Sequence, residues 1–247
     1  MKKILSLFVA LVAVLSLAAC GKKETTAKGY GLVHKDYVGI AEITVDKKGV
    51  VTALTFEEVY FPTHWAALST TEGVNADLFV TYVTAKGKEA NVAKYVVVDG
   101  KLFTGTVNGT DVKYVSSDIA DLKTACTDKE ETAKWYAEAL LAGNAFAANA
   151  DGSKAAFEIT ADKEGGFKKS TTGYWPQGDK YPLGWKGNMA ALSEALVGTE
   201  MGFADADLAK NADKVWELKG VVTKATLTDA KDYVAVAQKA YNTATAK

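Results

Sequence analysis

Three threonines stand at close spacing before the last helix that the sequence predicts. Thr223, Thr226 and Thr228 alternate with lysine and apolar residues, and the expected helix at residues 229–243 follows directly. A phosphate joined to Thr226 would lie just ahead of a helix N-terminus, where unpaired N–H groups and the helix dipole favour an anion. Neighbouring lysines would add positive charge. The same pattern is also typical of an ordinary strand end that leads into a helix capped by Thr228, so both interpretations stand.

A second group of candidate residues is aromatic and lies in a Gly-rich connection earlier in the chain. It comprises Tyr174, Trp175, Tyr181 and Trp185. Flat side chains of this kind can form the wall of a pocket for a planar ring, because small-molecule pockets are mostly apolar with few polar groups. Each of these residues could equally belong to the hydrophobic core.

Cys20 ends a segment that has the anatomy of an export signal. Two lysines open the chain, an apolar stretch at residues 4–17 follows, and two alanines come directly before the cysteine. The segment resembles the lipobox of exported bacterial lipoproteins. Its apolar stretch is shorter than the roughly 20 residues that a membrane-spanning helix needs. A lipoprotein signal is therefore favoured over a membrane span and over an ordinary secretory signal with an incidental cysteine.

This interpretation divides the chain into three parts. Residues 1–19 would be removed as the signal peptide, and Cys20 would carry diacylglycerol, with palmitate-type acyl chains, as the new N-terminus. Residues 20–28 are polar and lysine-rich and are expected to be a tether. Residues 29–247 would form one domain at the extracytoplasmic face of the cell membrane.

The composition excludes several classes of function. Without the first 19 residues the chain has 27 basic and 30 acidic residues, a net charge of −3, which argues against nucleic-acid binding. The sequence contains no arginine, so bidentate guanidinium recognition of phosphate is excluded. With Cys20 lipidated, Cys126 is the only other thiol, and no zinc-type spacing, Gly-rich phosphate loop or Gly-x-Ser-x-Gly motif occurs. We therefore expect no catalytic residue, no metal and no intramolecular disulfide.

The elements that must position these residues are strands first and helices later. Alternation of β-branched, aromatic and polar residues predicts strands at residues 37–45, 50–60, 93–98, 101–107 and 111–115. Helical spacing predicts helices at residues 128–142, 188–197, 205–212 and 229–243. Asp128 is the expected N-cap of the first helix. The order indicates an α+β domain with an antiparallel sheet and helices.

The remaining polar residues are expected to be structural. His34 is predicted at the surface of a hairpin loop, and Lys168 and Lys169 on a solvated surface. Glu57 and Glu58 are neighbours in a strand, so their side chains point to opposite faces and would not share one site.

Residues 220–241 resemble the end of FMN-binding domains. That family includes the flavinylated subunits of sodium-pumping quinone reductases and exported electron-transfer lipoproteins, and its attachment motif reads Asp-x-x-Ser/Thr-Gly-Ala-Ser/Thr. Thr223 matches the first hydroxyl of the motif, Ala225 the alanine, and Thr226 the residue that receives the flavin. Thr228 extends the match.

Two positions depart from the family's motif. Gly220 stands where the acidic residue is expected, and Lys224 where the glycine is expected. A glycine lets an attaching enzyme approach the backbone closely, which a lysine side chain hinders. Other segments of the chain, at residues 29–51, 172–188 and 194–198, also resemble parts of such domains.

The resemblance implies FMN as cofactor, bound covalently at Thr226 or non-covalently, with Trp175 and Trp185 as candidate pocket walls. It further implies an electron carrier held at the membrane by its lipid, with a flavin transferase and a membrane quinone oxidoreductase as partners. Two alternatives remain. The first is a non-redox lipoprotein whose degenerate FMN-like domain binds a small ligand or a surface partner. The second is a solute-binding lipoprotein of a transporter, for which the chain is short and lacks alternating βαβ halves.

Overall fold

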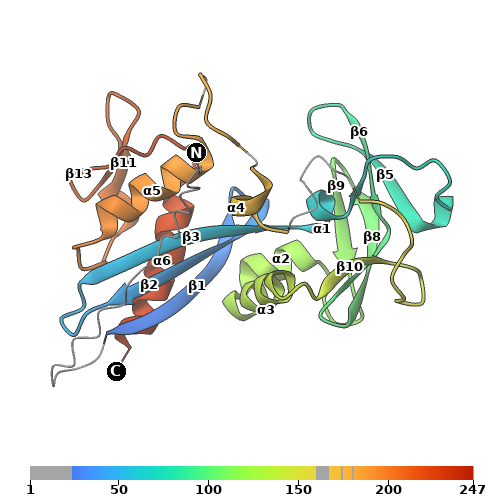
Figure 1. Cartoon of the computed structure of the whole chain (residues 1–247), viewed down its shortest axis with the longest axis horizontal. Coiled ribbons are helices and arrows are strands. Elements are labelled where there is room, and N and C mark those ends of the chain that lie inside the picture. The colour runs from blue at the N-terminus through green and yellow to red at the C-terminus, as the bar shows by residue number, and fades with distance from the viewer. Residues whose placement is uncertain (1–23, 160–166, 174, 180, 247) are drawn as a thin grey trace, which may run out of the picture.

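The computed structural model describes residues 24–159, 167–173, 175–179 and 181–246. The predicted signal, Cys20 and Tyr174 lie outside these residues. The described chain forms helices and four small antiparallel sheets, which confirms the predicted α+β class (Figure 1). None of the helices in this part of the chain combines the length and the apolar character that crossing a membrane requires.

Three long strands form the sheet that organises the site. They are β1 (Thr25–Val33), β2 (Tyr37–Val45) and β3 (Val51–Tyr60), paired antiparallel in that order. β2 matches its predicted bounds and β3 begins one residue later than predicted. The middle strand is buried at every position except Glu42 and Thr44, as expected for a strand with neighbours on both sides and helices packed on the sheet.

Strand β1 corrects the predicted tether. Thr25 to Lys28 lie in the segment expected to be a tether, yet they pair with residues 42–45 of β2. The Nζ of Lys28 lies 3.2 Å from the Glu42 carboxylate across the pair. The hairpin formed by β1 and β2 therefore begins nearer the N-terminus than its apolar residues indicate. Its backbone pairing continues to Thr25, beyond the point where the apolar alternation of β1 ends.

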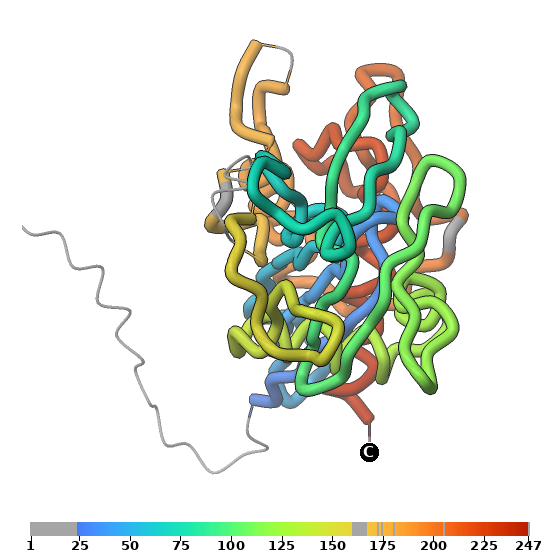
Figure 2. Tube along the Cα trace, turned by 90° about the vertical axis from the view of Figure 1, so that its right-hand side faces the viewer, coloured from blue at the N-terminus to red at the C-terminus, as the bar shows by residue number. Residues whose placement is uncertain are grey.

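The last helix, α6 (Ala230–Thr245), packs on β1 and β2. Figures 1 and 2 show this helix lying beside the first strands, although it is the last element of the chain. Its buried face includes Tyr233, Val236 and Ala240, as the helical spacing predicts. Gly29 permits the close approach: a Cβ at this position would lie 2.4 Å from the Val236 carbonyl oxygen and 2.5 Å from the Ala240 nitrogen.

A second group of strands occupies the chain between β3 and α4, on the right in Figure 1. One sheet has the order β10-β7-β8-β9 and the other β4-β6-β5. The strands are β4 (Ala67–Leu68), β5 (Phe79–Val83), β6 (Glu89–Ala93), β7 (Tyr95–Val98), β8 (Lys101–Asn108), β9 (Asp111–Val115) and β10 (Ala145–Ala148). The predicted strand at residues 93–98 is divided at Lys94, because its two halves pair in different sheets.

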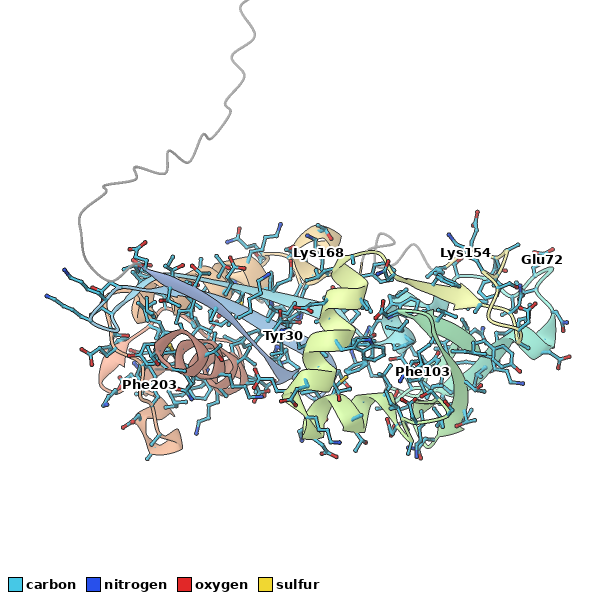
Figure 3. All side chains as sticks on the ribbon, turned by 90° about the horizontal axis from the view of Figure 1, so that it is seen from below. Tyr30, Glu72, Phe103, Lys154, Lys168 and Phe203 are labelled. Carbon is cyan, nitrogen blue, oxygen red and sulfur yellow. The ribbon has the colours of Figure 1, made fainter. Side chains whose placement is uncertain are left out.

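Helices α2 (Leu122–Asp128) and α3 (Glu130–Leu141) lie between the two groups of strands. Figure 3 shows α3 between the sheet that carries Tyr30 and the strands around Phe103. The hydroxyl of Tyr136 in α3 donates to the Tyr60 carbonyl at 2.6 Å and accepts from the Trp65 indole of α1 (Pro62–Trp65) at 2.9 Å. Both groups of strands therefore share one continuous hydrophobic core.

The predicted helix at residues 128–142 is wrong at its start. Asp128 is the last residue of α2, and Lys129 holds the N-cap position of α3. The acid that does cap a helix is Asp121, whose side chain accepts from the N–H groups of Lys123 and Thr124. The predicted helix corresponds to α3, which begins two residues later than expected because Lys129 adopts an extended backbone, and α2 was not predicted.

The C-terminal part supplies the rest of the site. Its elements are α4 (Lys169–Thr172), α5 (Gly184–Leu196), β11 (Leu208–Lys210), β12 (Trp216–Leu218) and β13 (Val221–Val222). α5 begins four residues before the predicted start at 188. The helix predicted at residues 205–212 is wrong: a single 3₁₀ turn, η3 (Asp205–Asp207), leads into β11, which pairs with β12.

Candidate functional site

The segment from Thr223 to Thr228 folds against β12 with alternate residues buried. Thr223, Ala225 and Leu227 are buried, whereas Lys224, Thr226 and Thr228 are exposed. Trp216 holds the segment: its carbonyl accepts from the Thr223 N–H at 2.8 Å, and its indole donates to the Leu227 carbonyl at 2.6 Å. The Thr223 hydroxyl accepts from the Ala225 N–H at 3.0 Å. Of the two matched hydroxyl residues, only Thr226 therefore reaches the surface.

A buried asparagine of α5 fixes the backbone of Thr226. The side-chain oxygen of Asn188 accepts from the N–H groups of Thr226 at 2.7 Å and Leu227 at 3.1 Å. Its amide nitrogen donates to the Gly184 carbonyl at 2.6 Å. One side chain thus joins the threonine segment to the first turn of α5. The sequence placed Asn188 at a helix start and gave no sign of this role beyond a polar residue among apolar ones.

The start of α6 differs from the prediction. Thr228 is not the N-cap; Asp229 holds that position and makes no side-chain bond to the helix. The Asp229 carboxylate instead lies 2.5 Å from Nδ1 of His34, in the turn between β1 and β2. The His34 N–H also donates to the Asp232 carboxylate at 3.0 Å. Helix α6 begins one residue later than expected, and its first acids bind the turn instead of the helix.

His34 continues into a cluster of buried polar side chains. Its Nε2 lies 2.9 Å from the Tyr233 hydroxyl, which also accepts from the Trp185 indole at 3.1 Å. The same indole N–H lies 2.5 Å from one carboxylate oxygen of Glu58. The other oxygen accepts from Nζ of Lys169 at 2.7 Å. Side chains from β3, α4, α5, α6 and the β1–β2 turn therefore meet in one network.

The Lys169–Glu58 ion pair is almost completely enclosed. The Glu58 side chain is 0% exposed and that of Lys169 is 2% exposed. Burial raises the pKa of Glu58 and lowers the pKa of Lys169, and the charge of each partner opposes the shift of the other. Removing two charges from water costs several kcal/mol per ion in typical proteins. A pair kept at that cost beside a cavity is a candidate functional group.

Neither residue of this pair was among the site residues predicted from the sequence. Lys169 was expected on a solvated surface, and that prediction is wrong because α4 packs on β3 and carries its first residue inward. Glu57 and Glu58 do point to opposite sides of β3, yet they bind consecutive residues of α4: Glu57 accepts from the N–H of Ser170 at 3.0 Å. The only sign of the pair in the sequence was Glu58, a charged residue at a strand position where a buried apolar residue would be expected.

Aromatic rings surround the Lys169 ammonium. Its Nζ lies 4.8 Å from the ring centre of Tyr37 and 5.7 Å from those of Trp175 and Trp185. The Trp175 ring also packs against Tyr181, with centres 4.9 Å apart. The structure describes three of the four predicted aromatic residues, Trp175, Tyr181 and Trp185, and brings them together. The Lys169 ammonium lies close to two of their rings, those of Trp175 and Trp185.

A cavity of about 450 Å³ opens beside these rings. Its lining includes Lys169, Trp175, Trp185 and the first turn of α5. Trp175 has a left-handed backbone, φ 65°, and its carbonyl accepts from the Trp185 N–H at 2.9 Å. Gly184 allows this wall to sit close, because a Cβ there would lie 2.8 Å from the Trp175 oxygen and 2.7 Å from the Gln177 nitrogen. A wider opening of about 950 Å³ beside the β7–β8 turn has no buried charged residue in its lining.

The two predicted groups of residues are therefore neighbours. Asn188 connects Thr226 to Gly184, and Gly184 lines the cavity that Trp175 and Trp185 border. Lys224 lies apart from this cavity, exposed and 3.8 Å from an exposed carboxylate of Glu194.

Neither a reactive thiol nor a metal-binding cluster is found among the described residues. Cys126 is buried, and burial raises the pKa of its thiol to about 12, so it is not a ready nucleophile. Within the ranges that the structure describes, no group of three or more His, Cys, Asp and Glu side chains is placed to hold a metal ion.

No protein-family model, curated protein or solved structure matches this chain.

Proposed function

We propose that this chain is an extracytoplasmic flavin-binding lipoprotein that carries electrons. Cys20 would anchor it to the cell membrane through lipid, and Thr226 would be the residue to which FMN is attached. When bound, FMN would supply transfer of one or two electrons, while the protein holds the ring and sets its potential.

The single observation that carries the proposal is the presentation of Thr226. The residue is exposed, yet its backbone N–H is fixed by the Asn188 side chain in a partly buried hydrogen bond of 2.7 Å. An acceptor residue for a modifying enzyme must be accessible, and a cofactor that transfers electrons must be held in place. Thr226 meets both requirements, and Asn188 joins its backbone to Gly184, which lines the aromatic cavity.

The residues present also fit the chemistry of the group. Nζ of Lys210 donates to the Thr226 carbonyl at 3.1 Å, so a cation lies beside the proposed attachment point. Lysines can hold a phosphate as point charges without the bidentate geometry of arginine. The cavity volume, about 450 Å³, falls in the range of small-molecule sites.

The expected partners follow from the same proposal. A flavin transferase would attach the cofactor, and a membrane quinone oxidoreductase would supply electrons to a carrier kept at the membrane surface by its lipid. Electron transfer through a bound flavin needs no catalytic side chain from this protein.

The test is co-expression of the chain with a flavin-attaching transferase. The purified protein should be yellow, and its flavin fluorescence should survive denaturing electrophoresis. Thr226→Ala should abolish that band, whereas Thr228→Ala, a change at another exposed threonine of the same segment, should retain it. A colourless protein without added mass would overturn the proposal, and colour lost on denaturation would replace covalent attachment by non-covalent binding.

Lys224 favours the alternative of a non-redox ligand-binding lipoprotein, since it stands where the family motif has glycine. Lys224→Gly separates the two. The side chain is exposed and makes only a surface ion pair, so its removal should leave folding intact and raise the flavinylated fraction. Restoring an acid at Gly220 is a poorer test, because that backbone has φ 80°.

A further inference from the structure

The buried ion pair has a definite orientation relative to the cavity. Lys169 is part of the cavity wall, whereas Glu58 lies behind it with no exposed surface. The described residues of the lining include a second lysine, Lys186, and no acidic residue. The pair therefore presents its positive end to whatever occupies the cavity.

The orientation is fixed by the surrounding side chains. One oxygen of Glu58 binds Lys169 and the other binds the Trp185 indole, which itself contacts Tyr233. The Trp185 ring borders the cavity, so the residue that holds the carboxylate in place is also part of the wall. The carboxylate cannot turn toward the cavity without giving up both bonds.

The field of this pair acts in a poorly screened environment. Aromatic rings lie on several sides of the ammonium, and electrostatic interactions are stronger there than in water. A cation that is 2% exposed and belongs to a residue of the cavity wall stabilises negative charge on an occupant. This stabilisation is greater for an occupant that carries more negative charge than for a neutral occupant.

We propose that the oriented Lys169–Glu58 pair tunes the occupant of this cavity, favouring a planar ring in its electron-rich, reduced state over the same ring when oxidised. The identity of the ring as flavin rests on the proposed function above. Uptake of two electrons and one proton leaves the ring with one more negative charge, and Lys169 stabilises that charge from the cavity wall. The electrons come from the reductant, which is a quinone oxidoreductase in the proposed function and dithionite in the test below.

The proposal predicts opposite effects for the two partners. Lys169→Met removes the positive end, so the reduced ring should lose its advantage. Glu58→Gln removes the negative end behind the ammonium, so a protonated Lys169 should favour the reduced ring more strongly. Because Glu58 no longer opposes the burial that lowers the pKa of Lys169, this variant is measured over a pH series that extends low enough to keep the lysine charged. A role in folding alone would not give opposite signs.

The experiment uses the full chain in detergent, with Thr226→Ala as background and free riboflavin as probe. Riboflavin lacks the phosphate of FMN, so its binding does not depend on attachment. Fluorescence quenching gives the affinity for oxidised riboflavin, and a dithionite titration gives the midpoint potential of the bound ring. Lys169→Met should lower the ratio of reduced to oxidised affinity by about tenfold, which is about 30 mV for a two-electron couple. Glu58→Gln should raise the ratio.

A matched control is available in the second group of strands. Lys101 also pairs with an acid, Asp118, and its Nζ lies 5.6 Å from the ring centre of Trp135, but it does not line this cavity. Lys101→Met should leave both measurements unchanged. If Lys169→Met fails to fold, the double change Lys169→Met with Glu58→Gln leaves no unpaired buried charge. It should still lower the ratio, because the nearer, positive end is lost.

The outcomes distinguish this inference from the proposed function. Shifts of the same sign in the two single variants, an unchanged ratio in the double variant, or no riboflavin binding would overturn the inference. Riboflavin binding with the predicted shifts, but no covalent fluorescence in the chain that retains Thr226, would support the inference and overturn attachment at Thr226.

Discussion

The Asp229 carboxylate lies 2.5 Å from Nδ1 of His34, which ties the residue before α6 to a turn 195 positions earlier in the chain. Asp232, one turn into the helix, binds the N–H of the same histidine. Together these contacts connect the threonine segment, α6 and the first hairpin. The position of Thr226 is therefore set by the first hairpin as well as by Asn188.

The first prediction concerns which residue matters at the start of α6. Asp229→Ala should destabilise the protein by about 1 kcal/mol, because a partly exposed charge-assisted contact to His34 is lost. Thr228→Ala should change stability by less than about 0.5 kcal/mol, since Thr228 is exposed and is not the N-cap. Urea unfolding of the two variants measures the difference. Equal losses would restore Thr228 as the cap and contradict the arrangement described.

The second prediction concerns Asn188. Asn188→Ala leaves the buried N–H of Leu227 and the N–H of Thr226 without their acceptor, which should cost about 1–3 kcal/mol. Hydrogen exchange at the two amides should become faster, and co-expression with the transferase should give less flavinylated protein.

The control for Asn188 is Asn242 in α6, whose exposed side chain accepts from Gln238 in the same helix. Asn242→Ala should leave exchange at residues 226 and 227 unchanged. If Asn188→Ala also leaves it unchanged, the clamp does not hold the attachment segment.

Local pattern was sufficient for much of the first sheet and for the buried face of α6. Strand alternation located β2 at its observed bounds and β9 likewise, because these strands pair with sequence neighbours and each turn has a strong signal. The helical spacing of Tyr233, Val236 and Ala240 predicted the packed face of the last helix.

The functional cluster could not be predicted in this way, since its members come from five distant segments. Glu58 follows Glu57 in a strand, and the two were not expected to share a site. Lys169 follows Lys168, and both were expected on a solvated surface. Only the packing of α4 on β3 brings the two together. The helix predicted at residues 205–212 failed for a related reason: pairing with β12 overrides local helix propensity over β11.

The third prediction concerns the cavity wall. Gly184→Ala adds a Cβ within 2.8 Å of the Trp175 carbonyl oxygen and also places alanine at φ 54°. The Trp175 segment must move, so riboflavin affinity should fall at least tenfold and stability should fall by more than the ~1–2 kcal/mol that a left-handed residue alone costs.

Gly173→Ala provides the matched comparison. Gly173 has φ 65° but no atom within 4 Å of an added Cβ, and it lines the same cavity. This variant should show only the backbone cost and should retain riboflavin binding. Equal loss of affinity in the two variants would show that contact between Gly184 and the Trp175 segment does not shape the cavity.

The last prediction uses the buried thiol to test the core that joins the two groups of strands. Burial raises the pKa of Cys126 from 9.0 to about 12, so the unfolded chain releases this proton at lower pH than the folded chain does. The stability that the buried thiol contributes is fully present below pH 9 and is lost as pH rises toward 12, at about 1.4 kcal/mol per pH unit. Urea unfolding of the protein and of Cys126→Ala at a series of alkaline pH values should therefore give a stability difference that declines with this slope. The raised pKa values of Tyr30 and Tyr114 act equally in both proteins and cancel in the difference. Parallel stability curves would mean that the thiol ionises as readily in the folded protein as in the unfolded chain, and would contradict its place in the core between α2 and α3.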